Sequence, residues 1–123
     1  DKFDKEVNFA TDERMALKDS DSFEPHQQPA KVIDAMVPLL ELTKELKSAY
    51  LVRKHVNYLA DIPCYILGVQ FKSGLDLNGD RNLVLLDQIR SNIYFPGDLR
   101  IFIVNNKVLA KMTACEGAQL VKR

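Results

Sequence analysis

The sequence predicts an α+β fold, in which two main helices pack on a mixed or antiparallel sheet of four to six strands. Residues 48–53 and 64–71 are rich in the aromatic and β-branched residues that favour strands. The second of these segments is apolar at nearly every position, which is typical of a central strand covered on both faces. From residue 14 to residue 104 the patterns follow the order β-α-β-β-α-β, and a short helix and a strand come after them.

The first 28 residues are polar and charged, and they give the weakest pattern. Residues 1–12 have apolar side chains at odd positions and are expected to form a flexible lead-in or an edge strand. Residues 14–18 are expected to form a short first strand. The polar segment 19–28 contains Pro25 and is expected to be a loop.

A long helix is predicted over residues 29–46. Pro29 suits its first turn, where the missing N–H of proline costs nothing. Apolar side chains from Val32 to Leu40 repeat at helical spacing and form one stripe. Pro38 interrupts this pattern, and we expect a kink there because an interior proline removes one backbone hydrogen bond.

The second half of the chain alternates strands, turns and shorter helices. A polar connection over residues 56–63 joins the two central strands, and Asn78-Gly79 signals a turn. A second helix is predicted over 82–92, a strand over 99–104, a helix over 107–115 and an edge strand over 118–122. Gly117 is expected to end the last helix in a left-handed conformation.

Length and composition restrict the class of protein. The 123 residues fit a single domain, 1–123. The 17 basic and 17 acidic side chains cancel, which argues against a nucleic-acid partner. No apolar run approaches the roughly 18 residues of a membrane span, so no membrane partner is expected. The two cysteines, Cys64 and Cys115, are expected to be reduced and buried, which favours a cytoplasmic location.

The sequence holds no motif for catalysis or for a cofactor. His26 and His55 are the only histidines, and their spacing fits no metal site. Either could act as a general base, but no nucleophile motif accompanies them. Asp76, Asn78 and Asp80 resemble the start of a calcium loop, yet Gly79 stands at the fourth position and not at the sixth. We therefore expect no enzyme, no cofactor and no metal ion.

A partner-binding surface is predicted beside the connection between the central strands. Its candidate residues are Arg53, Lys54, His55, Tyr58 and Leu59. Tyrosine beside arginine is a common composition of interaction hot spots. In the alternative interpretation, Tyr58 and Leu59 close the end of the core.

Four short segments resemble one known family. They are the helix opened by Pro29, the strands around 48–51 and 66–69, and the end 120–123. Over residues 15–123 the chain resembles the C-terminal domain of the SseB-type (enhanced serine sensitivity) bacterial proteins. It departs from the family pattern at Leu120-Val121, where an aromatic pair is usual, and at Asn105, where aspartate is typical.

The resemblance implies a bacterial, cytoplasmic domain that functions in protein binding or regulation and is not an enzyme. Two alternatives stay open: a small-molecule domain that senses amino acids, and an immunity protein that neutralises a partner toxin. A protein partner is expected under the first interpretation, and a homodimer is compatible with it.

Overall fold

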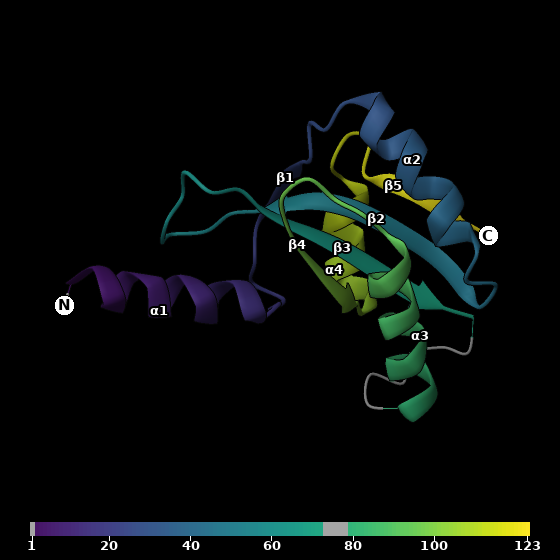
Figure 1. The fold of residues 1–123 in the computed structure, drawn as a ribbon, viewed down its shortest axis with the longest axis horizontal. Helices are drawn as coiled ribbons and strands as arrows, with labels where there is room; N and C mark the ends of the chain where they lie inside the picture. Colours follow the sequence, from purple (N-terminus) through teal and green to yellow (C-terminus); the bar gives the residue numbers. More distant parts are fainter. Residues whose placement is uncertain (1, 73–78) are drawn as a thin grey trace.

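The computed structural model of the chain describes residues 2–72 and 79–123. Within these residues, four helices and five strands alternate along the chain (Figure 1). The helices are α1 (Lys2–Met15), α2 (Ala30–Glu41), α3 (Asp80–Asn92) and α4 (Asn106–Thr113). The strands are β1 (Phe23–Pro25), β2 (Leu46–Lys54), β3 (Cys64–Phe71), β4 (Asp98–Ile103) and β5 (Gln119–Lys122). The predicted α+β class is confirmed. From β1 onward the elements follow the predicted order β-α-β-β-α-β and then a helix and a strand, but the first strand lies at residues 23–25 and the helix α1 precedes it.

The sheet is mixed. Its main path runs β1-β2-β3-β4, and β5 also pairs with β2. The strand β2 is antiparallel to β1, β3 and β5, whereas β4 is parallel to β3. Because β3 takes one edge of β2, the short strands β1 and β5 share the other edge: β1 pairs near Lys54 and β5 pairs near Ala49. The strand β4 therefore ends the sheet on the opposite side.

Helices cover both faces of the sheet. On one face, Met36 and Leu40 of α2 and Leu85, Leu86 and Ile89 of α3 pack on the strands. On the other face, Val108 and Met112 of α4 do the same. Between them, all residues of β3 are buried except two that are half-buried, which confirms the prediction of a central strand covered on both faces.

Gly68 in β3 allows α4 to approach the sheet closely. A Cβ atom at this position would lie 2.4 Å from the Met112 sulfur and 3.1 Å from a methyl group of Val104. The absence of a side chain at Gly68 is thus what lets Met112 pack against the centre of the sheet.

The prediction for the N-terminal residues is wrong. Residues 2–15 form the helix α1, not a lead-in or an edge strand, and residues 14–18 do not form a strand. The first strand, β1, lies inside the segment 19–28 that was expected to be a loop. Ala10 and Arg14 are four residues apart on one face of α1, and both are buried. The rest of α1 extends away from the sheet (Figure 1).

Other boundaries differ by a few residues. The helix α2 continues through Pro38 as one helix but ends at Glu41, before the predicted residue 46. Gly117 has the expected left-handed conformation, with φ of 72°, but α4 ends earlier, with Ala114 as its C-cap. Gly117 therefore shapes the loop before β5. The calcium-like positions Asp76 and Asn78 lie outside the described residues.

Candidate functional site

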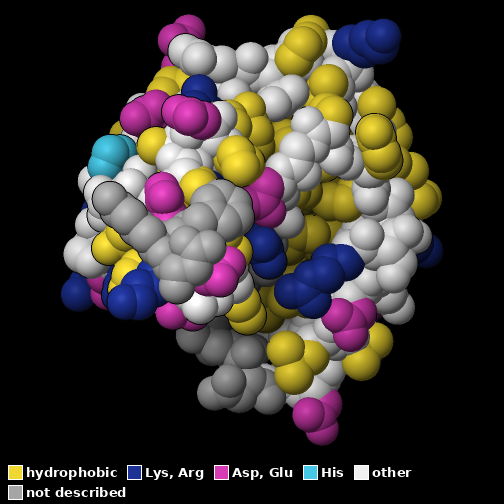
Figure 2. All heavy atoms as spheres, turned by 60° about the vertical axis from the view of Figure 1, so that its left-hand side comes forward, with side chains coloured by type: hydrophobic (Ala, Val, Ile, Leu, Met, Phe, Trp, Pro, Cys, Tyr) yellow, Lys and Arg dark blue, Asp and Glu magenta, His cyan; other side chains and the backbone are white. Residues whose placement is uncertain are grey.

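A groove of about 560 Å³ follows the outer edge of β4. Four consecutive residues of the strand line it: Leu99, Arg100, Ile101 and Phe102. Successive side chains of a strand point to opposite faces of a sheet. A groove lined by four residues in a row must therefore run along the edge of the strand and not over one face. Figure 2 turns this side of the molecule forward and shows hydrophobic side chains in a hollow with basic side chains beside it.

The end of α1, the end of α3 and the loop after α3 form the walls of the groove. The helix α3 and the loop after it contribute Arg90, Ile93, Phe95 and Gly97, and the last residue of α1 contributes Met15. The rings of Phe95 and Tyr65 lie 4.9 Å apart, which holds the loop against β3. Met15 is 62% exposed and adds a large apolar side chain to the surface of the groove.

The main chain of β4 faces the groove at alternate residues. The backbone N–H of Val104 donates to the carbonyl oxygen of Val69 over 3.1 Å, so the even-numbered residues here turn their main chain toward β3. Leu99, Ile101 and Ile103 accordingly turn their N–H and C=O groups outward. Among the strands of the described residues, none pairs with this edge. It can accept hydrogen bonds from an added strand and donate to it.

Three arginines and two aspartates set the charge around the groove. Asp98 accepts from Arg14 over 2.9 Å and from Arg100 over 3.2 Å, and Asp87 accepts from Arg90 over 3.0 Å. The Arg14 side chain is only 6% exposed, whereas those of Arg100 and Arg90 are 40% and 52% exposed. These five groups therefore carry one positive charge in excess, and the two arginines that line the groove, Arg90 and Arg100, are the accessible cations among them.

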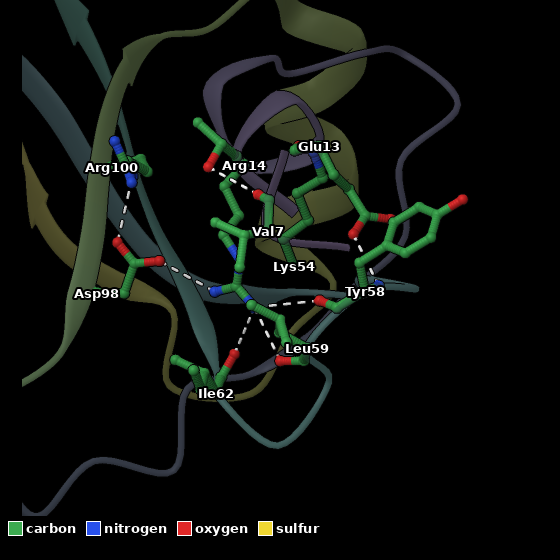
Figure 3. A network of polar contacts seen from close by, with 10 residues as sticks. Val7, Glu13, Arg14, Lys54, Tyr58, Leu59, Ile62, Asp98 and Arg100 are labelled. Carbon is green, nitrogen blue, oxygen red and sulfur yellow. Dashed lines mark hydrogen bonds and ion pairs between the residues drawn. The ribbon is translucent and has the colours of Figure 1, made fainter. Parts of the chain in front are cut away.

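Arg14 joins α1 to the connection between β2 and β3 (Figure 3). Beside its ion pair, its guanidinium donates to the carbonyl oxygens of Leu59 over 3.1 Å and Ile62 over 2.7 Å. The preceding residue, Glu13, accepts from the backbone N–H groups of Asn57 and Tyr58. Through these contacts the last turn of α1 is anchored, and Met15 is placed at the groove.

Lys54 is a structural residue and not part of an exposed surface. Its side chain is 3% exposed, and its ammonium donates to the carbonyl oxygens of Glu13 and Ala16. A cation suits this position because the C-terminal end of a helix carries partial negative charge. The prediction that Lys54 is available to a partner is wrong, since Lys54 holds the end of α1.

The other predicted site residues do not form one surface. Arg53 lies over the ring of Tyr65 at 6.0 Å, and His55 is exposed. Arg53, Lys54 and His55 line a small hollow of about 120 Å³ that leaves out Tyr58 and Leu59.

Tyr58 is 38% exposed, and its ring stacks on Phe9 at 5.1 Å. Leu59 is half-buried in a left-handed conformation, with φ of 52°. Tyr58 therefore packs against α1 through Phe9 and keeps more than a third of its surface exposed.

The two cysteines and His26 are the remaining side chains that could react, and all three are at least partly buried. Burial raises the pKa of the Cys64 and Cys115 thiols, so both are weaker nucleophiles than a free cysteine. The ring of His26 is buried; its Nδ1 accepts from the backbone N–H of Gln28, so its Nε2 donates to the carbonyl oxygen of Gly117. In the described part of the chain, no three His, Cys, Asp or Glu residues are grouped to hold a metal ion.

Comparisons with known proteins add no relative. A scan against protein-family models, and searches of curated proteins and of solved structures, found no match to this chain. None of the helices in residues 2–72 and 79–123 is long and apolar enough to cross a membrane.

The sequence pattern did not identify the groove. Its residues come from α1, α3 and β4, and nothing in their spacing shows that they meet. The available signal was the strand 99–104 itself, which is apolar and has neither proline nor lysine. That pattern is typical of a strand with a neighbour on each side, and the sequence does not show that one neighbour is absent.

Proposed function

We propose that this chain is a non-enzymatic domain for protein interaction or regulation, and that it binds an extended segment of a partner along β4. One observation carries the proposal: within the described residues, β4 has an edge that pairs with no strand, and this edge lies in a groove lined by apolar side chains and two arginines. Strand addition to an exposed edge is a common mode of peptide recognition, in which the main chain supplies affinity and pockets supply specificity.

The composition of the strands supports this choice of edge. Natural proteins protect sheet edges with short strands, prolines and lysines. The strand β1 has three residues and ends in Pro25, and β5 has four residues and ends in Lys122. In contrast, β4 has six residues, and among them is neither proline nor lysine. Its two charged residues, Asp98 and Arg100, form an ion pair with each other, and the greater length of this edge fits a site that accepts a strand.

The resemblance to the SseB-type C-terminal domain agrees with a binding role in a bacterial cytoplasm, and both attributes are part of the proposal. An immunity protein that neutralises a partner toxin stays an alternative to this role.

A small-molecule sensor is the second candidate, favoured by the groove volume. A hollow of about 560 Å³ lies in the usual range for ligand pockets, and Arg90 and Arg100 could bind a carboxylate. Thermal denaturation with a panel of amino acids tests it. A ligand at 100 times its dissociation constant stabilises by about 2.7 kcal/mol, and the absence of any shift counts against a sensor.

The test of the interaction function uses two variants of one residue. Proline at Ile103 removes an outward N–H without disturbing the pairing with β3, and alanine at the same position removes the side chain but keeps the N–H. Partner capture from cells of the source is quantified for the wild type, Ile103→Pro and Ile103→Ala, each with its melting temperature. We expect Ile103→Pro alone to lose the partner. Equal capture by all three would contradict binding along β4.

A further inference from the structure

We infer that the partner segment alternates branched apolar residues with acidic residues, and that its acidic side chains lie on the α4 side of the sheet, beside Arg100. The inference rests on the proposed function and names the chemistry of the partner. It follows from the two faces of β4, from the charges around the groove and from the shape of the groove.

The two faces of β4 differ in character. Leu99, Ile101 and Ile103 pack with the core beneath α2 and α3. Phe102 packs with the core beneath α4, so Arg100, two residues before it, points to that same face. A strand added to β4 continues both faces, and its side chains pair with those of β4 across the strands. Alternate residues of the partner therefore lie beside three apolar side chains on one face and beside Arg100 on the other.

The charges favour carboxylates on the second face. Both oxygens of Asp98 are bonded, one to Arg14 and one to Arg100. The contact of Arg100 uses its Nε atom, and within the described residues no acceptor is recorded for its two Nη atoms. Those donors suit a carboxylate of the partner. A lysine of the partner at this position would instead place a second positive charge beside Arg100.

The shape of the groove favours a single strand over a second copy of the domain. Arg90 and Ile93 at the end of α3 and Met15 at the end of α1 line the groove together with the edge of β4. A second copy would bring its own Met15 and its own α3 toward the same space, whereas an extended segment brings only its main chain and alternate side chains.

Designed peptides test this inference on the full chain. The probe is a soluble seven-residue peptide that alternates valine with glutamate, and the comparison peptide has lysine in place of each glutamate. Binding is followed by NMR chemical shifts of the protein amides. We expect the glutamate peptide to shift the amides of residues 99–103 and to bind at least about threefold more tightly than the lysine peptide, the size of a favourable cross-strand charge pair.

Two arginine variants test whether Arg100 causes the preference for the glutamate peptide. Arg100→Gln is expected to weaken binding of the glutamate peptide about threefold. Arg81→Gln is the matched control, because Arg81 of α3 forms an exposed ion pair with Glu45 and does not line the groove. Binding of the glutamate peptide should be unchanged in this control. An equal loss in both variants would contradict the role of Arg100.

Three other results would overturn the inference in different ways. Equal binding of both peptides at residues 99–103 would remove the acidic preference and leave the proposed function in place. Absence of peptide binding, together with unchanged partner capture by Ile103→Pro, would contradict both proposals. A concentration-dependent dimer in light scattering, lost in Ile103→Pro but kept in Ile103→Ala, would assign the edge to a second copy.

Discussion

The two edges of the sheet are built in opposite ways. At the β2 side, two short strands from distant parts of the chain share one edge, and side chains hold them in place. His26, just after β1, bonds to Gly117, just before β5, over 3.0 Å. Arg123, just after β5, donates to the carbonyl oxygen of Glu41 at the end of α2 over 2.8 Å. At the β4 side, no described strand pairs and the edge lies in a groove.

The two sides of the sheet differ in what their polar contacts hold in place. Beside β2, the contacts hold the short strands β1 and β5 on the sheet. Around the open edge, Arg14, Asp98 and Lys54 hold α1 and the β2–β3 connection without touching the outward main chain of β4. Within the described residues, the edge of β4 is thus kept in position and pairs with no strand, as the proposed binding of a partner segment requires.

Arg14→Ala is expected to have the largest effect on stability. The change leaves Asp98 with one cation and releases the carbonyl oxygens of Leu59 and Ile62, so the free energy of unfolding should fall by about 3 kcal/mol. Urea denaturation measures it. Arg90→Ala is the control, because Arg90 forms an exposed ion pair that contributes about 0–1 kcal/mol. Equal effects of the two changes would refute the anchor at the open edge.

Gly68→Ala tests the packing of α4 against the centre of the sheet, between the two edges. The added Cβ would overlap the Met112 side chain, and overpacking of this kind costs about 1–3 kcal/mol. In combination with Met112→Ala the two losses should not add, because truncation of Met112 removes the clash. Calorimetric melting of the single and double variants gives the coupling. Strict additivity would show that Met112 is not what excludes a side chain at residue 68.

Lys54→Met is expected to destabilise by about 1–3 kcal/mol, because it keeps the buried stem but leaves the carbonyl oxygens of Glu13 and Ala16 without their donor. Lys47→Met is the control, an exposed lysine in the same strand, and should change little. Urea denaturation compares them. If Lys54→Met left stability intact but abolished partner capture, Lys54 would belong to a binding surface after all.

The cysteines report on opening of the strand beside the groove. Cys64 is 1% exposed and pairs with Asp98 of β4, whereas Cys115 is half-buried. Burial raises both thiol pKa values, so at pH 8 a disulfide reagent should modify Cys115 first and Cys64 only after local opening. The slow phase of modification should be absent in Cys64→Ala, which would assign that phase to Cys64. Equal rates would mean that the β3–β4 pair opens freely.

The raised pKa values of the two thiols also predict how the stability of the fold depends on pH. A thiol whose pKa is raised in the folded state stabilises the fold below its unfolded value, and this contribution is lost as the pH rises through the folded value. The free energy of unfolding should therefore decline above the ordinary thiol pKa of 9.0, and less steeply in Cys64→Ala. Identical slopes for the wild type and Cys64→Ala would contradict this linkage.

Most of the sheet and the three later helices could be predicted from the sequence, because their patterns depend on local periodicity. Cys64–Phe71 was predicted with its observed limits, since a strand buried on both faces is apolar throughout. The helix α1 was missed because few apolar residues mark it, and its buried face depends on Arg14, whose partners lie 44 to 84 residues away. Charged residues are rarely expected inside a protein.

The site could not be predicted for a related reason. Lys54 was interpreted as a surface residue on its charge alone, although it is buried against the end of α1. The strand β4 was predicted nearly within its limits, but whether a strand lies at an edge depends on the order of strands in the sheet. That order follows from long-range pairing, such as the parallel alignment of β4 with β3.

Amide hydrogen exchange measured by NMR tests the open edge most directly. The N–H groups of Arg100, Phe102 and Val104 face β3 and should exchange slowly, whereas those of Leu99, Ile101 and Ile103 face the groove and should exchange fast. In β2, residues 48–53 have strands on both sides and should not show this alternation. Slow exchange at all six of these amides in the free chain would contradict an open edge.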